Sequence, residues 1–367
     1  MSELERDIRA QPAAFRELIR SGPDRWERAL TALRGAGGPG PRRIVLCGMG
    51  SSYFASVGAA AALRRWGLPA AAALASELLY DGGPDPEPGD WLVAVSQSGE
   101  SVEVVRLLER LASRDVTVLA VTSRDGNPVA GMSRAVLTLE TPPDHGVAVK
   151  SFGASLLTLL YLGNRLAGRP PAEWLEPARD AVEALDSLMP SAAEWLALGR
   201  AMDPRLHAMV TLARGPVAAA AREAALLGNE VAKFPAWFEE AGEFRHGIIE
   251  LAGPHTLACL LVPSGPTGHL QVSLARELAR TGAPVLATAP PRLADALRDA
   301  GARAIPVPDV PEDYAALPHL LPFQWLTVGW AEARGFVPGR FRYIPSVIRS
   351  EGPEPGPSPD PGGGEGR

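Results

Sequence analysis

The chain has 367 residues, of which 46% are hydrophobic and 21% charged, and its formal net charge is −6. A chain of this length has room for two domains, and the composition is ordinary for a soluble enzyme. The charge argues against a nucleic-acid-binding surface, and no apolar run approaches the length of a membrane span. The charged N-terminus does not resemble a signal peptide. We therefore expect a cytoplasmic protein with neither nucleic-acid nor membrane partners.

The first glycine-rich turn follows a predicted helical segment at residues 1–34. An apolar run begins at Arg43 and ends in the turn Gly48-Met-Gly-Ser-Ser52, and an alanine-rich helix then extends to Arg65. A strand that passes through such a turn into a helix is typical of an anion site, because free N–H groups and the helix dipole point at one place. The glycine spacing does not fit the dinucleotide fingerprint, and the P-loop lysine is absent. A nucleotide cofactor is therefore disfavoured.

A second turn of this kind carries the strongest functional signal in the chain. The buried-strand pattern Trp91–Val95 stops at Ser96-Gln-Ser-Gly-Glu-Ser101, and an amphipathic helical pattern runs from Val102 to Leu111. The serine hydroxyls and the glutamine amide are neutral donors that suit a phosphate ester. The alternative is a serine N-cap before an ordinary turn. Two such turns in one parallel sheet would face a common crevice.

The second half of the chain weakly repeats the first. Strand patterns at residues 207–215, 256–262 and 284–288 match those at 43–50, 91–95 and 116–122 in order and approximate spacing. The two cysteines, Cys47 and Cys259, fall within predicted core strands, which fits a reducing compartment. The predicted domains are a helical segment 1–34, a first α/β domain 35–166, a helical linker 167–202, a second α/β domain 203–350 and a disordered tail 351–367.

The second half also contains candidate acid–base residues. Glu223 and Glu230 are seven residues apart on one predicted helix and therefore share a face, and His246 follows shortly after. A histidine and carboxylates are what proton transfer on a sugar needs. The alternative is that the carboxylates form a solvated helix face and that the histidine only caps a helix.

Together these segments resemble the sugar isomerase (SIS) domain family. More narrowly, they are similar to the tandem-SIS isomerase half of the glutamine–fructose-6-phosphate aminotransferases. The resemblance covers roughly residues 4–350 and rests on the two turns, Gly146-Val-Ala-Val-Lys-Ser-Phe152, Glu223, Glu230 and Gly242-Glu-Phe-Arg-His-Gly247. It implies an α/β fold of two tandem SIS domains, each a parallel sheet flanked by helices in a flavodoxin-like three-layer sandwich.

The resemblance also assigns roles to residues. It implies that Glu230 is the base moving a proton between sugar C1 and C2. It implies that His246 opens the sugar ring from the neighbouring subunit, and hence a homodimer. Val147 matches a substrate-contacting backbone position, and no cofactor or metal is expected. The remaining substrate-binding candidates are Ser51, Ser52, Ser96, Gln97, Ser98, Ser101 and Glu223.

Two departures from the family bear on the reaction. The sequence begins at Met1 without the glutaminase domain, so we expect no ammonia production from glutamine within this polypeptide. Pro345 stands at the position of the family's catalytic lysine, and Leu227 stands near that of a second lysine. Synthase activity by Schiff-base chemistry is therefore disfavoured.

The reaction expected from these residues is proton abstraction at C1 or C2 of an amino-hexose 6-phosphate or a fructose 6-phosphate derivative. This would be an isomerisation coupled to loss of an amine. Two alternatives remain open from the sequence. One is a lyase that follows the same proton abstraction with β-elimination, and the other is a non-catalytic phosphosugar sensor.

Overall fold

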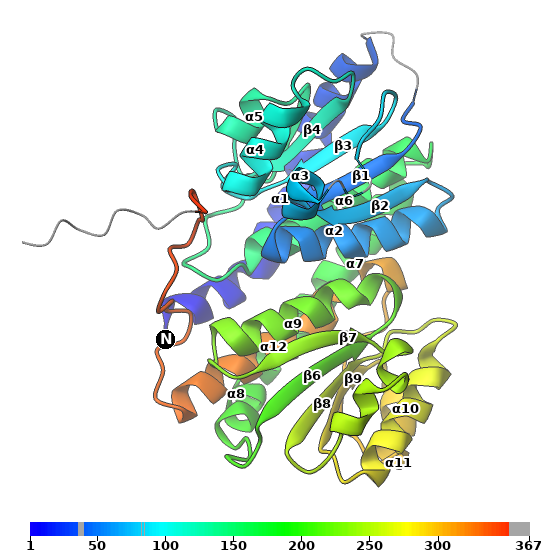
Figure 1. Cartoon of the computed structure of the whole chain (residues 1–367). Coiled ribbons are helices and arrows are strands. Elements are labelled where there is room, and N and C mark those ends of the chain that lie inside the picture. Colours follow the sequence, from blue (N-terminus) through cyan, green and yellow to red (C-terminus); the bar gives the residue numbers. More distant parts are fainter. Residues whose placement is uncertain (36–39, 82, 84, 352–367) are drawn as a thin grey trace, which may run out of the picture.

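The protein forms two α/β lobes stacked on a shared helical layer (Figure 1). The structure is a computed structural model, which describes residues 1–35, 40–81, 83 and 85–351. The predicted disordered tail lies, from residue 352 onward, outside the described residues. Within the described ranges, no helix is long and apolar enough to cross a membrane.

The first lobe is a five-stranded parallel sheet in the order β2-β1-β3-β4-β5. This is the flavodoxin-like order, in which ligands bind where the strand order reverses between β1 and β3. Alternate residues of each strand serve two cores: Leu46 packs in the core that contains α2 and α6, whereas Cys47 packs in the core that contains α4. The strands are β1 (Ile44–Gly48), β2 (Ala70–Leu74), β3 (Trp91–Val95), β4 (Thr117–Thr122) and β5 (Ala135–Thr138). The helices are α2 (Gly50–Arg65), α3 (Ala75–Tyr80), α4 (Val102–Leu111), α5 (Pro128–Gly131) and α6 (Lys150–Leu166).

The second lobe is a parallel sheet in the order β10-β9-β8-β6-β7, which is the same topology as the first. Cys259 is buried in β8, as predicted for a core strand. The strands are β6 (Ala208–Ala213), β7 (Ala236–Glu240), β8 (Thr256–Leu261), β9 (Val285–Ala289) and β10 (Arg303–Pro306). The helices are α9 (Ala218–Glu230), α10 (Gly268–Arg280) and α11 (Pro291–Asp299), with single turns η2 (Gly215–Val217), η3 (Glu243–Arg245), η4 (Ile248–Leu251) and η5 (Glu312–Tyr314).

The segment between Glu230 and His246 contains Pro235 and Gly242, which in the sequence alone indicate an irregular connection. Instead Ala236–Glu240 forms the edge strand β7, which pairs in parallel with β6. Pro235 lies just before the strand, where its missing N–H interrupts no ladder.

Long helices join the two lobes. They are α1 (Glu3–Gly35), α7 (Ala172–Leu188), α8 (Ala192–Arg200) and α12 (Ala316–Ala333), with the single turn η1 (Met189–Ser191) after α7. Helix α1 covers most of residues 1–34, and α7 and α8 lie within residues 167–202. Trp26 of α1 packs against Tyr161 and Trp174 at ring-centroid distances of 5.0 and 6.0 Å. Helices α8 and α12 touch backbone to backbone, because a Cβ at Gly199 would lie 2.0 Å from the Leu326 carbonyl oxygen.

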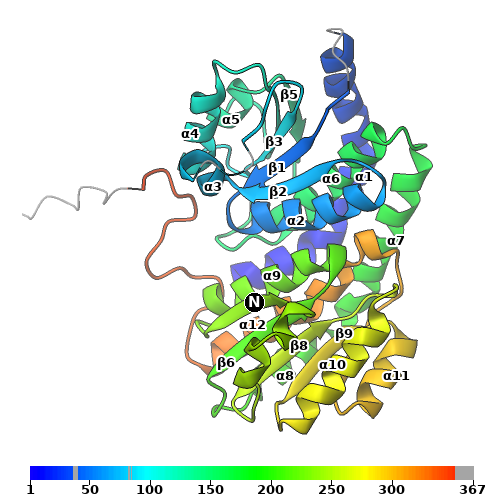
Figure 2. The same cartoon turned by 45° about the vertical axis from the view of Figure 1, so that its right-hand side comes forward.

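After α12 the chain returns to the first lobe. Figure 2 shows this red C-terminal segment passing outside the lower lobe toward α3 and α4. Several contacts hold its end: the Val102 N–H donates to the Ile348 carbonyl at 3.1 Å, Arg349 forms an ion pair with Glu100, and Arg106 forms one with Glu351 at 2.6 Å. Residues from both lobes and from this segment therefore meet at the carboxyl edge of the first sheet.

Candidate functional site

A cavity of about 990 Å³ lies at that carboxyl edge. It is lined by the turns after β1, β3 and β4, the loop before α6, the end of α9 and the C-terminal segment. Its position at the β1–β3 switch point is where open α/β sheets bind ligands. Most of the predicted site residues line it, namely Ser51, Ser52, Gln97, Ser98, Ser101 and Glu230.

Ser96 shapes the Ser96–Ser101 turn instead of lining the cavity. Its side chain is buried, its hydroxyl lies 3.2 Å from the Ser101 hydroxyl, and it accepts the Gly99 N–H at 3.1 Å. The Ser98 hydroxyl accepts the Glu100 N–H at 3.1 Å. The turn is thus partly closed by its own hydrogen bonds, which fixes the direction of its remaining donors toward the cavity.

Asn127 packs against the Ser96–Ser101 turn at Gly99. Gly99 has a φ of +68°, and a Cβ there would lie 2.0 Å from the Asn127 side chain, so only glycine fits. Asn127 Oδ1 accepts the Ala130 N–H at 2.9 Å, and Nδ2 donates to Thr122 Oγ1 at 2.9 Å and to the Arg124 carbonyl at 2.8 Å. One buried amide therefore links the turn after β3 to the turn after β4.

Glu223 connects the two lobes below the cavity. The Ser51 hydroxyl, at the start of α2, lies 3.0 Å from Glu223 Oε1 on α9. Glu223 is fully buried, and its Oε2 has no hydrogen-bond partner among the described residues. Burial raises the pKa of Glu223 well above its usual range, and the nearby Glu230 raises it further. This shift favours the protonated form of Glu223 relative to an exposed carboxyl group.

Glu230 is the last residue of α9, and its side chain lines the cavity. Burial raises the pKa of Glu230 to about 7, and the Lys233 ammonium opposes the rise. A carboxyl group that titrates near neutral pH can both accept and return a proton there. Glu230 therefore has the properties of a general base at the site.

Val147 and His246 do not line the cavity themselves. Val147 is buried in the core, whereas its neighbours Gly146 and Ala148 are at the cavity wall. This arrangement suits a contact through the backbone. His246 is exposed at the end of η3. Its predicted role in ring opening from a neighbouring subunit stays a prediction.

No lysine lines the cavity among the described residues. The chain contains two lysines. Lys150 is buried and bound to the Asp7 and Asp144 carboxylates, and Lys233 turns back to donate to the Glu230 carbonyl. Pro345, at the position predicted from the family for a lysine, does line the cavity. The site as described thus offers a carboxylate base without an amine for a Schiff base.

The sequence interpretation missed several cavity residues. Ser123 and Arg124 directly follow β4, so the rule that parallel strands end at one edge could have found them. Asp144 accepts N–H groups from the first turn of α6 and orders the loop that carries Val147. Arg349 had no comparable signal, because it reaches the cavity only through the return of the C-terminal segment.

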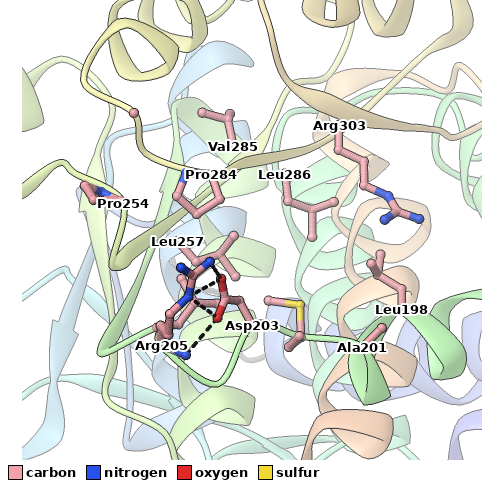
Figure 3. A pocket seen from close by; sticks show the side chains of 13 residues that line it. Leu198, Ala201, Asp203, Arg205, Pro254, Leu257, Pro284, Val285, Leu286 and Arg303 are labelled. Carbon is pink, nitrogen blue, oxygen red and sulfur yellow. Dashed lines mark hydrogen bonds and ion pairs between the residues drawn. The ribbon is translucent and has the colours of Figure 1, made fainter.

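A second cavity, of about 400 Å³, contains none of the predicted site residues. It lies at the amino ends of β8 and β9, with Leu257, Pro284 and Leu286 in its wall and the Asp203–Arg205 ion pair at one side (Figure 3). Its wall is mainly apolar, and its carboxylate, Asp203, has its pKa lowered to about 2 by hydrogen bonds from Arg205, which makes it a poor base. Nor do the described residues include a group of three His, Cys, Asp or Glu side chains that could hold a metal ion.

Comparison with known proteins identifies the family. The sequence pattern of the SIS domain matches residues 40–164 and 206–289, one match in each lobe. The chain belongs to the SIS domain family. Among curated SIS proteins, the glutamine–fructose-6-phosphate aminotransferase of Pyrobaculum aerophilum is 30% identical over 316 residues, which is 84% of this chain and 52% of that protein. The chain spans about half the length of such relatives.

Solved structures of other proteins share the fold over nearly the whole chain. The C-terminal domain of glucosamine-fructose-6-phosphate aminotransferase from Francisella tularensis superposes with a TM-score of 0.82 at 19% identity, covering 91% of this chain and 97% of that one. A glucosamine-6-phosphate deaminase from Thermotoga maritima gives 0.75 at 20% identity, covering 95% and 99%. These likenesses confirm the predicted fold of two tandem SIS domains.

Proposed function

We propose that this SIS protein is an amino-sugar-phosphate isomerase or deaminase that abstracts a proton at C1 or C2 of a hexose 6-phosphate. The observation that carries the proposal is that one cavity contains both the Ser96–Ser101 turn and the Glu230 carboxyl. The turn presents hydroxyl and amide donors at the start of α4, where a phosphate group is favoured. Glu230 approaches from the other lobe with a pKa of about 7.

The reaction follows from this arrangement. In the open-chain form of glucosamine 6-phosphate, the proton on C2 is acidic because it is adjacent to the C1 aldehyde. Glu230 removes that proton and returns it to C1, while the C1 oxygen gains a proton that the substrate's ammonium group loses, so the amino aldehyde becomes a 2-iminium alcohol. Water then hydrolyses the iminium group, and the products are fructose 6-phosphate and ammonia. The carboxylate-rich cavity suits the ammonium group of the substrate, and the absence of a lining lysine among the described residues favours this direction over Schiff-base chemistry.

Incubation with glucosamine 6-phosphate tests the proposal. The wild type is expected to release ammonia and fructose 6-phosphate, and Glu230→Gln to lose at least about a hundredfold in kcat, since general-base catalysis is typically worth 10²–10⁴. Glu183→Gln, on the exposed face of α7, is the matched control and keeps full activity. An ultraviolet-absorbing enal product would instead identify a lyase, and tight binding without turnover would identify a sensor. Either result would overturn the proposal.

Phosphate recognition is tested separately. Ser98→Ala combined with Ser101→Ala removes two hydroxyls that line the cavity. We expect this variant to bind glucosamine 6-phosphate at least about tenfold more weakly in titration calorimetry while it stays folded, with only a small loss of thermal stability because the Ser98 hydroxyl also accepts the Glu100 N–H. Binding of unphosphorylated glucosamine as tight as that of the phosphate ester would contradict the assignment of the turn.

A further inference from the structure

The cavity lining offers little unpaired positive charge to a phosphate group. Five carboxylate side chains and two arginines line it, and three of the carboxylates have basic partners: Glu100 pairs with Arg349, Glu140 with Arg25 and Asp144 with Lys150. One of the arginines, Arg349, is already paired with Glu100. The other, Arg124, forms no side-chain hydrogen bond or ion pair with any described residue, and its side chain is exposed at the cavity. Arg124 is thus the one cavity-lining cation in the described part of the chain that is not neutralised.

The neutral donors of the turn are also partly occupied. The backbone N–H groups of Gly99 and Glu100 already donate to the Ser96 and Ser98 hydroxyl oxygens, so these two N–H donors are used within the turn while the hydroxyl O–H groups can still donate. The first N–H of α4, from Val102, donates to the Ile348 carbonyl. Glu103, which has no ion-pair partner among the described residues, and the ionised form of Glu230 oppose the approach of an anion to the donors that remain.

The backbone of Arg124 is fixed to this turn. The N–H of the preceding residue, Ser123, donates to the Gln97 carbonyl at 3.0 Å. The Arg124 carbonyl accepts Asn127 Nδ2 at 2.8 Å, and the Asn127 side chain packs directly under Gly99. The guanidinium is therefore free to move while its attachment point is held beside the turn. Because its backbone is already fixed, Arg124 can bind a ligand through its side chain with little loss of backbone entropy.

We propose that Arg124 is the charge-recognition residue of the cavity and pairs with the phosphate of the ligand seated on the Ser96–Ser101 turn. The planar guanidinium matches two phosphate oxygens in a bidentate pair. This inference rests on the proposed function for the location of the site and deepens it. The ligand is selected as a phosphate dianion, by charge as well as by the shape of the turn.

Titration calorimetry with inorganic phosphate and with glucosamine 6-phosphate tests this role. We expect Arg124→Gln to weaken both by about ten- to a hundredfold, as for loss of charge-assisted hydrogen bonds, and to flatten the dependence of affinity on salt. Arg124→Lys keeps the positive charge but cannot form the bidentate pair, and it is expected to recover part of the affinity. Arg134→Gln, an exposed arginine at the amino end of β5, is the matched control and binds as the wild type does.

The outcomes separate the two proposals. Unchanged affinity and salt dependence in Arg124→Gln would overturn the role of Arg124 and leave the proposed function intact. Arg124-dependent binding of inorganic phosphate, with no turnover of any phosphosugar, would support Arg124 and overturn the proposed function. A wild type that binds neither probe would overturn both.

Discussion

At the scale of single residues, the Glu230 carboxyl links the pH dependence of stability to the site. Its pKa is raised from 4.5 to about 7, so the folded protein holds this proton more tightly than the unfolded chain does. The stability gained from the protonated form is present below pH 4.5 and is lost as the pH rises through 7. Glu230→Gln should therefore increase the free energy of unfolding at pH 8 by up to about 3 kcal/mol and change it little at pH 4.5.

Urea denaturation at the two pH values measures the effect, with Glu183→Gln again as the control. Equal effects of Glu230→Gln at both pH values would mean that the carboxyl is not perturbed by burial. Ionisation of Glu230 lowers stability, but it is expected to raise activity. Because the base must be ionised, we expect kcat/KM to rise with pH through about 7.

Replacing Gly99 is expected to affect both stability and phosphate binding. Its left-handed backbone costs an L-residue about 1–2 kcal/mol, and a Cβ would in addition collide with Asn127. Gly126 is a matched control in the neighbouring loop, because its φ is +83° but a Cβ there meets nothing within 4 Å. We expect Gly126→Ala to cost about 1–2 kcal/mol of stability and to retain phosphate binding. Gly99→Ala should cost more and abolish binding. Equal behaviour of the two variants would contradict the support role of Asn127.

At the scale of elements, Lys150 connects α1 to the loop that borders the cavity. Its ammonium is almost fully buried between Asp7 of α1 and Asp144, and Asp7 also accepts the His145 N–H at 2.7 Å. Lys150→Met leaves Asp7 charged and buried without this partner, which is expected to cost about 3–5 kcal/mol. The double variant Asp7→Asn with Lys150→Met removes the unpaired charge and should recover much of that loss. Thermal and urea unfolding of the three proteins measure it, and a double variant no more stable than the single one would contradict the ion-pair explanation.

Elements were predictable from the sequence wherever local pattern and tertiary environment agree. Helix α4 begins at Val102 and ends at Leu111, as its amphipathic pattern indicates. The four edge strands β2, β5, β7 and β10 were missed, and two of them show the physical reason. Strand β2 is Ala-Ala-Ala-Ala-Leu, a sequence of strong helix formers that is extended only because it pairs with β1. Strand β7 ends in Glu239-Glu240 and is half-buried throughout, so it lacks the apolar signal of the central strands.

At the scale of the whole molecule, the cavity could be predicted only in part. The two serine turns were found because each follows a strand in one sheet, and that topology brings them together. The approach of Glu230 from the second lobe came from resemblance alone, since nothing local predicts how two lobes pack. The C-terminal wall of the cavity depends on contacts such as Val102 with Ile348, which join distant parts of the chain and leave no periodic pattern.

The exposed position of His246 bears on whether two subunits share a site. Because His246 is outside the cavity of its own chain, any role in ring opening requires a neighbouring subunit. Inactive Glu230→Gln and inactive His246→Ala subunits, mixed equally and exchanged, form hybrid dimers with one intact site, so about a quarter of wild-type activity should return. Mixing Glu230→Gln with Ser98→Ala/Ser101→Ala is the control, because Glu230 and the turn belong to one chain's cavity and no hybrid site is intact. If subunit exchange is demonstrated by native mass spectrometry and the first mixture stays inactive, His246 does not complete the site of a partner.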